Sequence, residues 1–387
     1  MNDNPIWGPG WDEVRALWPL DPAVAHLNHG SYGAVPTRVL AAQERWRQQA
    51  ESNPMGFYSR VHDHAVDQAR REVAVFLGAD PEGLAFVDNA TSGVNTILAY
   101  LPLGEGDELL ITDHAYGAVL IAAEVACEHT GARLITAEVP FPPEDAGEVV
   151  ASILDAVSDR TQLAIIDWVA SPTALTFPVG AIVAALREVG VPTLVDGAHT
   201  PGQLAVDLTE LDADYYVGNL HKWACAPRPS AVMYLREQHR ERVKPLIVSW
   251  DHRAPFPRQF TLTGTTDHSA WLAAPDAIQF LADLGWDHLR AHNLELAKYG
   301  QDVVASALRV QAPRYDAAAM RVVPLPEGVA DTRGAADALA ARIAAELATE
   351  VAINPWKGHH GLLRLSAQAY NSPQEYELLA EGLRDLL

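Results

Sequence analysis

The sequence contains little cysteine and no long apolar run, and both absences limit what the protein can be. Among 387 residues only Cys127 and Cys225 are cysteines. Two cysteines cannot form a disulfide framework, so we expect a reducing, cytoplasmic setting. No stretch approaches the ~20 apolar residues that cross a bilayer. Residues 1–20 lack the basic start and apolar segment of a signal peptide. We therefore expect a soluble cytoplasmic protein without a membrane partner.

Basic residues are also scarce. The formal net charge is −22 and the isoelectric point is about 5.0, which argues against a nucleic-acid partner. Hydrophobic residues make up 49% and charged residues 20% of the chain, as in ordinary globular proteins. The length is sufficient for one large domain and a smaller one.

Lysine is rarer still, and this scarcity draws attention to one position. Only four of the 28 basic residues are lysines, and Lys222 lies in the segment Asn219-Leu220-His221-Lys222-Trp223. It comes 26 positions after Asp196, in the segment Val195-Asp196-Gly197-Ala198-His199. An amine that must lose its proton to form an imine cannot be replaced by a guanidinium. Asp196 could hold a pyridine nitrogen protonated. This pairing suggests pyridoxal phosphate chemistry.

The first two thirds of the chain alternates between strands and helices. After helices at Pro36–Gln49 and Val61–Leu77, short apolar runs alternate with helical stretches, which indicates a mostly parallel sheet covered on both faces. Ser230–Leu235 follows Tyr215–Val217 without room for a crossover helix, so we expect these strands to pair antiparallel. The other predicted strands are Leu84–Val87, Glu108–Ile111, Arg133–Ala137, Leu163–Asp167 and Thr193–Val195; the predicted helices are Gly93–Leu101, Gly117–Thr130, Asp145–Val157 and Val179–Val189.

The pattern changes near Asp267. We expect a large domain over residues 21–268 and a smaller α+β domain over residues 1–20 and 269–387, with a long bridging helix. The elements predicted for the smaller domain are helices at Ala270–Leu284, Trp286–Leu308 and Ala335–Leu347, strands at Val322–Pro324, Glu350–Ile353 and Leu362–Ser366, and a final helix from Pro373.

Polar segments follow several of the predicted strands. In an open α/β sheet, ligands bind beyond the carboxyl ends of the strands. One such loop is an ordinary turn, whereas several that converge indicate a site. The segments are Asp88–Gly93, Asp113–Gly117, Ser171–Thr173, Asp196 and Lys222.

A phosphate-binding segment is expected near Thr91 and Ser92. Small polar residues at the start of a helix present free N–H groups and the positive end of the helix dipole. Asn219 and His221 could donate to the same phosphate, and Gly264-Thr265-Thr266 could reach it across a dimer interface. The alternative is that Thr91 or Ser92 simply caps the helix.

Three further residues have both a structural and a functional interpretation. His114 could stack on an aromatic ring or be an ordinary structural histidine. Asp196 alone could cap a helix after Ala198, and Lys222 alone could be a surface charge. The joint occurrence of Asp196 and Lys222 favours the functional interpretation of both.

Arg364 lies within the apolar run Leu362–Ser366, where a cation needs a partner. One interpretation is a salt bridge to a protein carboxylate. The other is a bidentate clamp for the α-carboxylate of a substrate.

These motifs resemble class V of the fold-type I pyridoxal-phosphate enzymes, in particular the isopenicillin N epimerase-like branch. The resemblance covers nearly the whole chain, and the order and spacing of the motifs are specific at family level. It implies an α/β large domain with a mostly parallel seven-stranded sheet, a smaller α+β C-terminal domain, and homodimers with shared active sites. The motifs are Leu27–Gly33, Asp113–Gly117, Ser171–Thr173, Asp196–His199, Asn219–Trp223, Gly264-Thr265, Arg364–Ser366 and Tyr370-Asn371.

The resemblance also implies roles for single residues. Lys222 would form the imine with pyridoxal phosphate, Asp196 would pair with the ring nitrogen, and His114 would stack on the ring. Arg364 would take the substrate carboxylate. No metal is implied. The remaining residues implied to bind the cofactor are Thr91, Ser92, Thr173, His199, Asn219, His221, Gly264 and Thr265, and those implied to bind the substrate are Asn28, His29 and Tyr116.

The branch contains several chemistries, which the sequence leaves open. The leading hypothesis is β-elimination from an S-substituted cysteine in a secondary-metabolic or thiol pathway. The alternative is an epimerase, whose second acid we would seek among His29, Tyr32 and Tyr116. Decarboxylative oxidation and a fold retained without turnover are further options. Persulfide-forming desulfuration is rejected, because no cysteine follows Cys225. Trp168 stands where relatives often carry histidine.

Overall fold

A computed structural model describes residues 11–387 of the chain. The described chain divides into two compact units. The large unit comprises residues 38–169 and 177–280, and the small unit comprises residues up to Thr37, 170–176 and 281–387. The domain boundaries expected from the sequence, at residues 20 and 268, stay a prediction. Residues 1–10 of the predicted N-terminal part lie outside the described residues.

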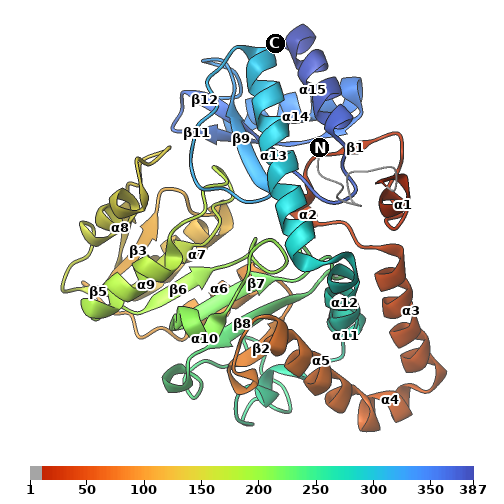
Figure 1. Cartoon of the computed structure of the whole chain (residues 1–387). Coiled ribbons are helices and arrows are strands. Elements are labelled where there is room, and N and C mark those ends of the chain that lie inside the picture. The colour runs from red at the N-terminus through yellow and green to blue at the C-terminus, as the bar shows by residue number, and fades with distance from the viewer. Residues whose placement is uncertain (1–10) are drawn as a thin grey trace. The chain divides into compact units, whose positions relative to one another are not determined.

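The large unit is built on a seven-stranded sheet with the strand order β2-β8-β7-β6-β5-β3-β4 (Figure 1). Strand β8 pairs antiparallel with both β2 and β7, and the other neighbours are parallel. The predicted α/β fold with a mostly parallel sheet is confirmed, and so is the predicted antiparallel pairing of β8 with β7. The antiparallel pairing of β8 with β2 is a second one. The strands are β2 (Leu84–Val87), β3 (Glu108–Thr112), β4 (Arg133–Ala137), β5 (Thr161–Asp167), β6 (Thr193–Asp196), β7 (Tyr215–Asn219) and β8 (Ala231–Leu235).

Apolar side chains on both faces of the strands explain why the sheet is buried. Strands β2, β3, β6, β7 and β8 are buried at every position, as expected for a sheet covered on both sides. One core joins alternate strand residues such as Ile111 and Ile165 to Val94 and Val119 on two helices. The helices of this unit are α3 (Thr37–Ser52), α4 (Pro54–Arg60), α5 (His62–Phe76), α6 (Ala90–Ala99), α7 (Gly117–Thr130), α8 (Ala146–Leu154), α9 (Val179–Glu188), α10 (Leu208–Leu211), α11 (Ser269–Leu272) and α12 (Ala274–Leu284).

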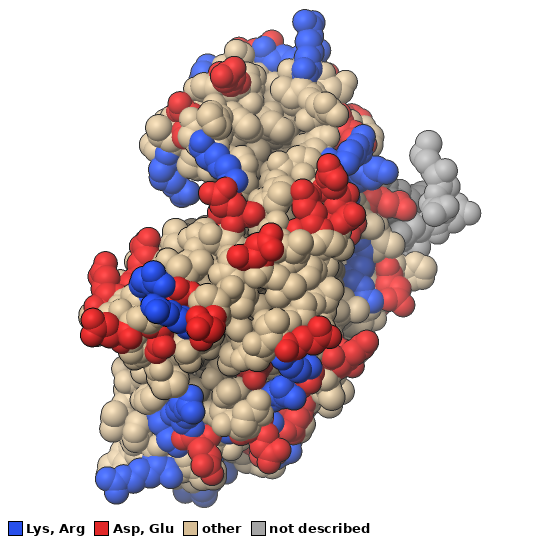
Figure 2. All heavy atoms as spheres, turned by 90° about the vertical axis from the view of Figure 1, so that its left-hand side faces the viewer, with Lys and Arg blue, Asp and Glu red and all other residues tan. Residues whose placement is uncertain are grey.

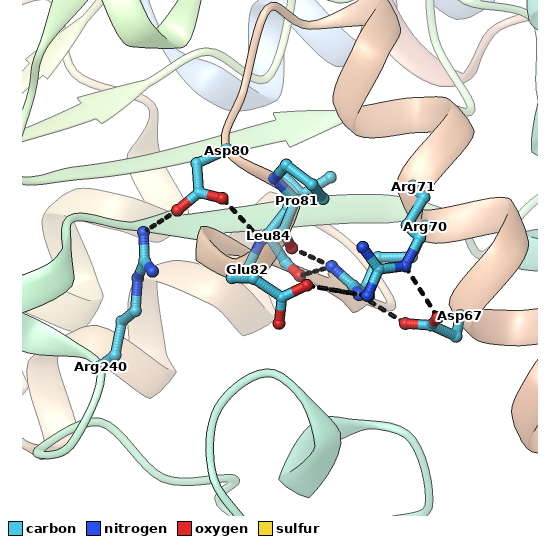
Figure 3. A network of polar contacts seen from close by, with 8 residues as sticks. All are labelled: Asp67, Arg70, Arg71, Asp80, Pro81, Glu82, Leu84 and Arg240. Atoms are coloured by element: carbon cyan, nitrogen blue, oxygen red, sulfur yellow. Dashed lines mark hydrogen bonds and ion pairs between the residues drawn. The ribbon is translucent and has the colours of Figure 1, made fainter.

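Short 3-10 turns complete the large unit, and one of them lies within a polar network around Arg70 (Figure 3). Buried Arg70 donates to the carbonyl oxygens of Pro81 and Leu84, and it also pairs with Asp67 on its own helix. Asp80 caps the turn through the Glu82 amide, at 3.0 Å. The network thereby fixes α5 against the start of β2. The turns are η1 (Pro81–Gly83), η2 (Glu237–His239) and η3 (Arg258–Phe260).

The small unit contains a three-stranded antiparallel sheet with the order β11-β12-β9, and a two-stranded parallel pairing of β1 with β10. Its core joins Leu27 to the helices and to the inner residues of the sheet, including Val323 and Leu363. The elements are α1 (Trp11–Arg15), β1 (Ala25–His26), α2 (His29–Tyr32), α13 (Trp286–Leu308), β9 (Met320–Pro324), α14 (Arg333–Leu347), β10 (Thr349–Glu350), β11 (Ala352–Trp356), β12 (His360–Ser366) and α15 (Pro373–Leu386).

Residues near the N-terminus are anchored within the small unit. The Trp11 indole donates to the carbonyl of Asn371 at 3.1 Å, and Arg15 pairs with Glu375 at 2.8 Å. Glu375 also completes a capping box at the start of α15. These contacts tie the first described helix to the last one.

The surface carries charges of both signs. On the face shown in Figure 2, acidic side chains are spread over the molecule and the basic ones do not merge into a continuous area. Within residues 11–387, none of the helices combines the length and the apolar character that are needed to cross a membrane.

Candidate active site

Lys222 lies in a loop that its own backbone holds in place. The loop begins where β7 ends and returns to β8. The amides of Leu220 and His221 both donate to the carbonyl of Ser230, at 3.0 and 3.1 Å, and the Cys225 amide donates to the carbonyl of Lys222 at 3.1 Å. Cys225 is buried and adopts a left-handed conformation, with φ of 57°. The sequence therefore places a partly buried amine at the carboxyl end of the sheet on a tightly bonded turn.

His199 contacts the Lys222 amine. Its Nε2 lies 3.3 Å from Nζ of Lys222, and its Nδ1 accepts from the indole N–H of Trp223 at 3.4 Å. An indole nitrogen can only donate, so the Nδ1 atom of a neutral imidazole is the acceptor and Nε2 carries the proton. That proton faces Lys222. An ammonium has no lone pair to receive it, whereas a neutral amine or an imine nitrogen has one. This contact suits the neutral amine or imine form of Lys222, whereas the charged form of the same amine lowers the pKa values of Asp196 and His221.

Asp196 is the buried carboxyl group of this cluster. It ends β6, it is 4% exposed, and its Oδ1 accepts from the amide of Ala198 at 2.9 Å. Burial raises the pKa of Asp196, and the Ala198 hydrogen bond and the positive charge of Lys222 act against that rise. A buried carboxylate is stabilised by a cationic neighbour. The site therefore suits a protonated ring nitrogen.

The start of α6 has the features of a helix N-terminus that can bind an anion. Asn89, in an extended conformation, accepts from the Ser92 amide at 2.8 Å, and Asn219 at the end of β7 accepts from the Ala90 amide at 2.9 Å. The helix begins at Ala90 instead of near Gly93, and its cap is Asn89. The alternative interpretation, in which Thr91 or Ser92 caps the helix, was therefore wrong. Within the described chain the Thr91 amide, on the first turn, has no acceptor, which leaves it for an anion.

His221 is held with a single proton in the absence of an anion. Its Nδ1 lies 2.8 Å from the carbonyl of Ser230. Burial and then the positive charge of Lys222 lower the pKa of His221 to about 4, and the Ser230 contact acts in the opposite direction. A neutral ring that donates from Nδ1 has only a lone pair on Nε2. For His221 to donate to a phosphate it must take up a second proton, which an incoming dianion would favour.

Two aromatic residues, His114 and Tyr116, follow β3, and their exposure differs from what a stacking role for His114 requires. His114 is fully buried, its Nε2 lies 3.1 Å from the carbonyl of Val139, and its ring meets Phe141 and Phe177 edge-on. A ring with no exposed surface has no face to offer a ligand, so stacking by His114 does not fit this structure. Tyr116, at the start of α7, is 46% exposed.

One acidic residue of this cluster was missed. Asp167 ends β5 and lies beside Asp196 in register on the neighbouring strand, and it is equally buried. The sequence did contain the signal, because a carboxyl group directly follows the apolar run 163–166 of a strand in the same sheet.

Arg364 is held within the small unit by uncharged groups. One terminal nitrogen donates to the carbonyl and hydroxyl of Ser171, at 2.8 and 2.9 Å. The other donates to the hydroxyl of Ser31 at 2.9 Å and to Oδ1 of Asn28 at 3.3 Å. Arg364 lies on β12 and is buried, with 3% of the residue exposed. Its orientation is thus fixed before any ligand arrives.

The remaining predicted residues are distributed over both units. In the small unit, His29 is buried with Nδ1 at 2.9 Å from the Tyr370 hydroxyl, Thr173 is buried, and Tyr32 is 74% exposed. In the large unit, Gly264 and Thr265 lie in an exposed loop. Throughout residues 11–387, no group of three or more histidine, cysteine or acidic side chains is arranged to hold a metal ion.

Comparison with known proteins defines the family. The family Aminotransferase class-V matches residues 32–379, so the chain belongs to it. The chain is 32% identical to isopenicillin N epimerase of Streptomyces clavuligerus, over 96% of this chain and 97% of that one. It is 34% identical to isopenicillin N epimerase of Amycolatopsis lactamdurans, over 97% and 98%.

Lyases are also among the similar proteins. A probable L-cysteine desulfhydrase of Arabidopsis thaliana is 28% identical over 95% of this chain and 84% of its own. Among solved structures, the cystine C–S lyase C-DES in complex with its product cysteine persulfide aligns with a TM-score of 0.78 and 19% identity, over 94% and 97% of the two chains. The cysteine desulfurase CsdA of Escherichia coli aligns with a TM-score of 0.80 and 19% identity, over 96% and 97%. At these identities the structural matches establish the fold.

The close approach of two loops yields a stability prediction. Gly202, with φ of 90°, lies directly against the backbone of Trp223 and Ala224, where a Cβ atom would clash. We expect Gly202→Ala to destabilise the protein by about 3 kcal/mol or more. Gly190 is the control, because its φ is 79° and no atom lies near its Cβ position. Gly190→Ala should cost only about 1 kcal/mol of backbone strain. Equal losses for the two variants in chemical denaturation would contradict the described packing of the lysine loop.

Proposed function

We propose that this protein is a pyridoxal-phosphate-dependent enzyme that acts at Cα of an amino acid. The observation that carries the proposal is the cluster of Lys222, His199 and Asp196 at the carboxyl ends of β6 and β7. When bound, the cofactor supplies an electron-poor ring that accepts the electrons of a bond broken at Cα. Lys222 would hold the aldehyde carbon, and Asp196 would keep the ring nitrogen protonated.

The phosphate would lie at the start of α6. The Thr91 amide and the side chains of Thr91 and Ser92 are on its first turn, and the helix dipole favours an anion there. Asn219 fixes this turn through the Ala90 amide, and His221 would donate once it is doubly protonated. Tyr116, which has an exposed ring, would take the stacking role instead of His114.

Arg364 would bind the carboxylate of the substrate. Ser171, Ser31 and Asn28 accept hydrogen bonds from both terminal nitrogens, two at each nitrogen. A substrate carboxylate would replace some of these uncharged acceptors, because charge-assisted, bidentate hydrogen bonds to a planar guanidinium are stronger than those to neutral groups. By fixing the carboxylate, Arg364 would orient Cα and so determine which of its bonds is broken. The proton at Cα would be taken by Lys222, because its amine is released when the substrate amine replaces it.

The reaction that we propose is β-elimination from an S-substituted cysteine, in a thiol or secondary-metabolite pathway. Elimination needs one base at Cα and a sulfur leaving group at Cβ, and Lys222 is sufficient as that base. The desulfhydrase likeness supports it. No cysteine after Cys225 is present to carry a persulfide.

Epimerisation is the second candidate, and the identity of 32–34% to two isopenicillin N epimerases over nearly the whole chain favours it. Epimerisation requires a second acid on the other side of Cα. His29 is engaged by Tyr370 and Gln368, which makes Tyr116 the better candidate for that acid.

We further propose a cytoplasmic homodimer with shared active sites. An exposed apolar segment follows β8: Leu246, Ile247, Val248 and Trp250 are 49%, 60%, 75% and 93% exposed. Such a patch favours burial against another protein surface. The exposed Gly264–Thr265 loop would reach the phosphate of the partner subunit. Both cysteines are buried thiols, which fits a reducing compartment.

Trapping of the cofactor tests the identity of the lysine. Purified protein should absorb near ~420 nm with pyridoxal phosphate bound, and borohydride reduction should fix the cofactor on the peptide that contains Lys222. Lys222→Ala should abolish both signals. Lys244→Ala, which changes an ordinary lysine beyond β8, should leave both unchanged. Label on another lysine, or no label, contradicts the proposal.

Product analysis separates the two candidate reactions. With S-conjugated cysteines we expect pyruvate and ammonia in equal amounts, and loss of both in Lys222→Ala. In heavy water, deuterium at Cα of a recovered, racemised amino acid without pyruvate would instead identify an epimerase. Consumption of oxygen with release of carbon dioxide would identify decarboxylative oxidation.

Replacement of Arg364 tests the carboxylate site. Arg364→Lys keeps the charge but loses the planar fork, and we expect kcat/KM to fall by about 30- to 100-fold, about 2–3 kcal/mol, mainly through KM. Arg321→Lys is the matched control, since Arg321 is also a buried arginine and lies on the neighbouring strand β9. An unchanged KM in Arg364→Lys, or an equal effect in Arg321→Lys, would exclude this role.

A further inference from the structure

Two buried carboxyl groups lie side by side at the carboxyl end of the large sheet. Asp167 on β5 and Asp196 on β6 are register partners on parallel strands, and each is 4% exposed. Neighbouring strands are ~4.8 Å apart, and partners in register point to the same face of the sheet. The Trp168 amide donates to the carbonyl of Asp196 at 2.9 Å, which fixes this register where the strands end.

Asp167 also reaches the loop on its other side. The backbone amide of Tyr116, which follows β3, lies close enough to the Asp167 carboxyl group to lower its pKa by hydrogen bonding, as the amide of Asp167 itself does. Strand β3 is the other neighbour of β5 in the sheet. Asp167 therefore lies between the carboxyl group proposed for the ring nitrogen and the residue proposed to stack on the ring.

The charged surroundings of the pair favour a single negative charge. Two carboxylates this close in a buried site cannot both ionise near neutral pH. Burial, and then the charge of Asp196, raise the pKa of Asp167 well above its usual range. Lys222 acts on Asp196 and favours its ionised form. The other titratable groups that follow the neighbouring strands are Asp113, His114 and Tyr116 after β3, His199 after β6 and His221 after β7.

We propose that Asp167 is a positioning residue of the cofactor site: a carboxyl group that stays protonated, leaves the negative charge on Asp196, and holds the Tyr116 amide. This inference rests on the proposed function for the roles of Asp196 and Tyr116. The protonation of Asp167 itself is a property of the chain without cofactor. A single negative charge on Asp196 would hold the ring nitrogen in its protonated form. No second carboxylate beside it would compete for that proton.

Infrared spectroscopy of the cofactor-free protein tests the protonation directly. At about pH 8 an exposed or unfolded aspartic acid is ionised. The difference spectrum between wild type and Asp167→Asn should therefore show loss of a protonated carboxylic acid C=O band. Loss of carboxylate bands alone would overturn the proposal. Wild-type protein with ¹³C-labelled aspartate provides a test that does not depend on the folding of the variant. The absence of any protonated aspartate band from its spectrum would also overturn the proposal.

Stability as a function of pH gives a second readout. Folded Asp167 keeps a proton that the unfolded chain loses above about pH 4, so by linkage the wild type loses stability as pH rises from there towards the raised folded pKa. Asp167→Asn lacks this loss. Its thermal midpoint should therefore rise relative to wild type between about pH 5 and about pH 8. Asp88→Asn, which changes an exposed carboxyl group after β2, should give a constant difference. A constant difference for Asp167→Asn contradicts the proposal.

Cofactor binding then tests the positioning role. Asp167→Asn is neutral and retains an acceptor for the Tyr116 amide, so it should bind pyridoxal phosphate within about twofold of wild type. Asp167→Leu removes that acceptor and should weaken binding about tenfold or more. Equal binding by the two variants excludes positioning through Tyr116. Because the infrared and stability measurements use cofactor-free protein, they can fail while trapping on Lys222 succeeds, and the reverse.

Discussion

The site depends on the attraction between the buried Asp196 carboxylate and the positive charge of Lys222. Burial disfavours an ionised carboxylate, and in the large unit only the Ala198 amide and the Lys222 charge act against that penalty. A carboxylate in such a place is stabilised further by each cation brought near it. In the role proposed for Asp196, a protonated ring nitrogen would offset the energetic cost of burying the carboxylate. Asp196 would then destabilise the site without a ligand and stabilise it with one.

The parallel sheet explains why these groups meet. Strands β5, β6 and β7 end at the same edge, and each contributes a polar residue there: Asp167, Asp196 and Asn219. The loop after β7 adds Lys222, and the Gly202 backbone packs against that loop. Asn219 links this edge to the start of α6. Rigid strand ends set the separations, so the polar groups do not depend on flexible loops for their positions.

The sequence predicted the sheet well because its strands are apolar on both faces, and the bounds of β2, β4, α7 and α13 agree residue for residue with the prediction. It predicted the site less completely. Asn89 was missed as the helix cap because Thr91 and Ser92, two and three positions further on, are also residue types that commonly cap helices. The burial of His114 depends on Phe141 and Phe177, which are distant in sequence. The pairing of Asp167 with Asp196 depends on strand order, and no local pattern contains that information.

The protonation state of the ring nitrogen tests the central claim most directly. With pyridoxal phosphate labelled with ¹⁵N in the ring, the nitrogen chemical shift distinguishes a pyridinium from a neutral pyridine. We expect a protonated nitrogen in the wild type near neutral pH and a neutral one in Asp196→Asn, because the amide carries no charge to hold the proton. A neutral nitrogen in the wild type, or a protonated one in Asp196→Asn, would contradict this claim.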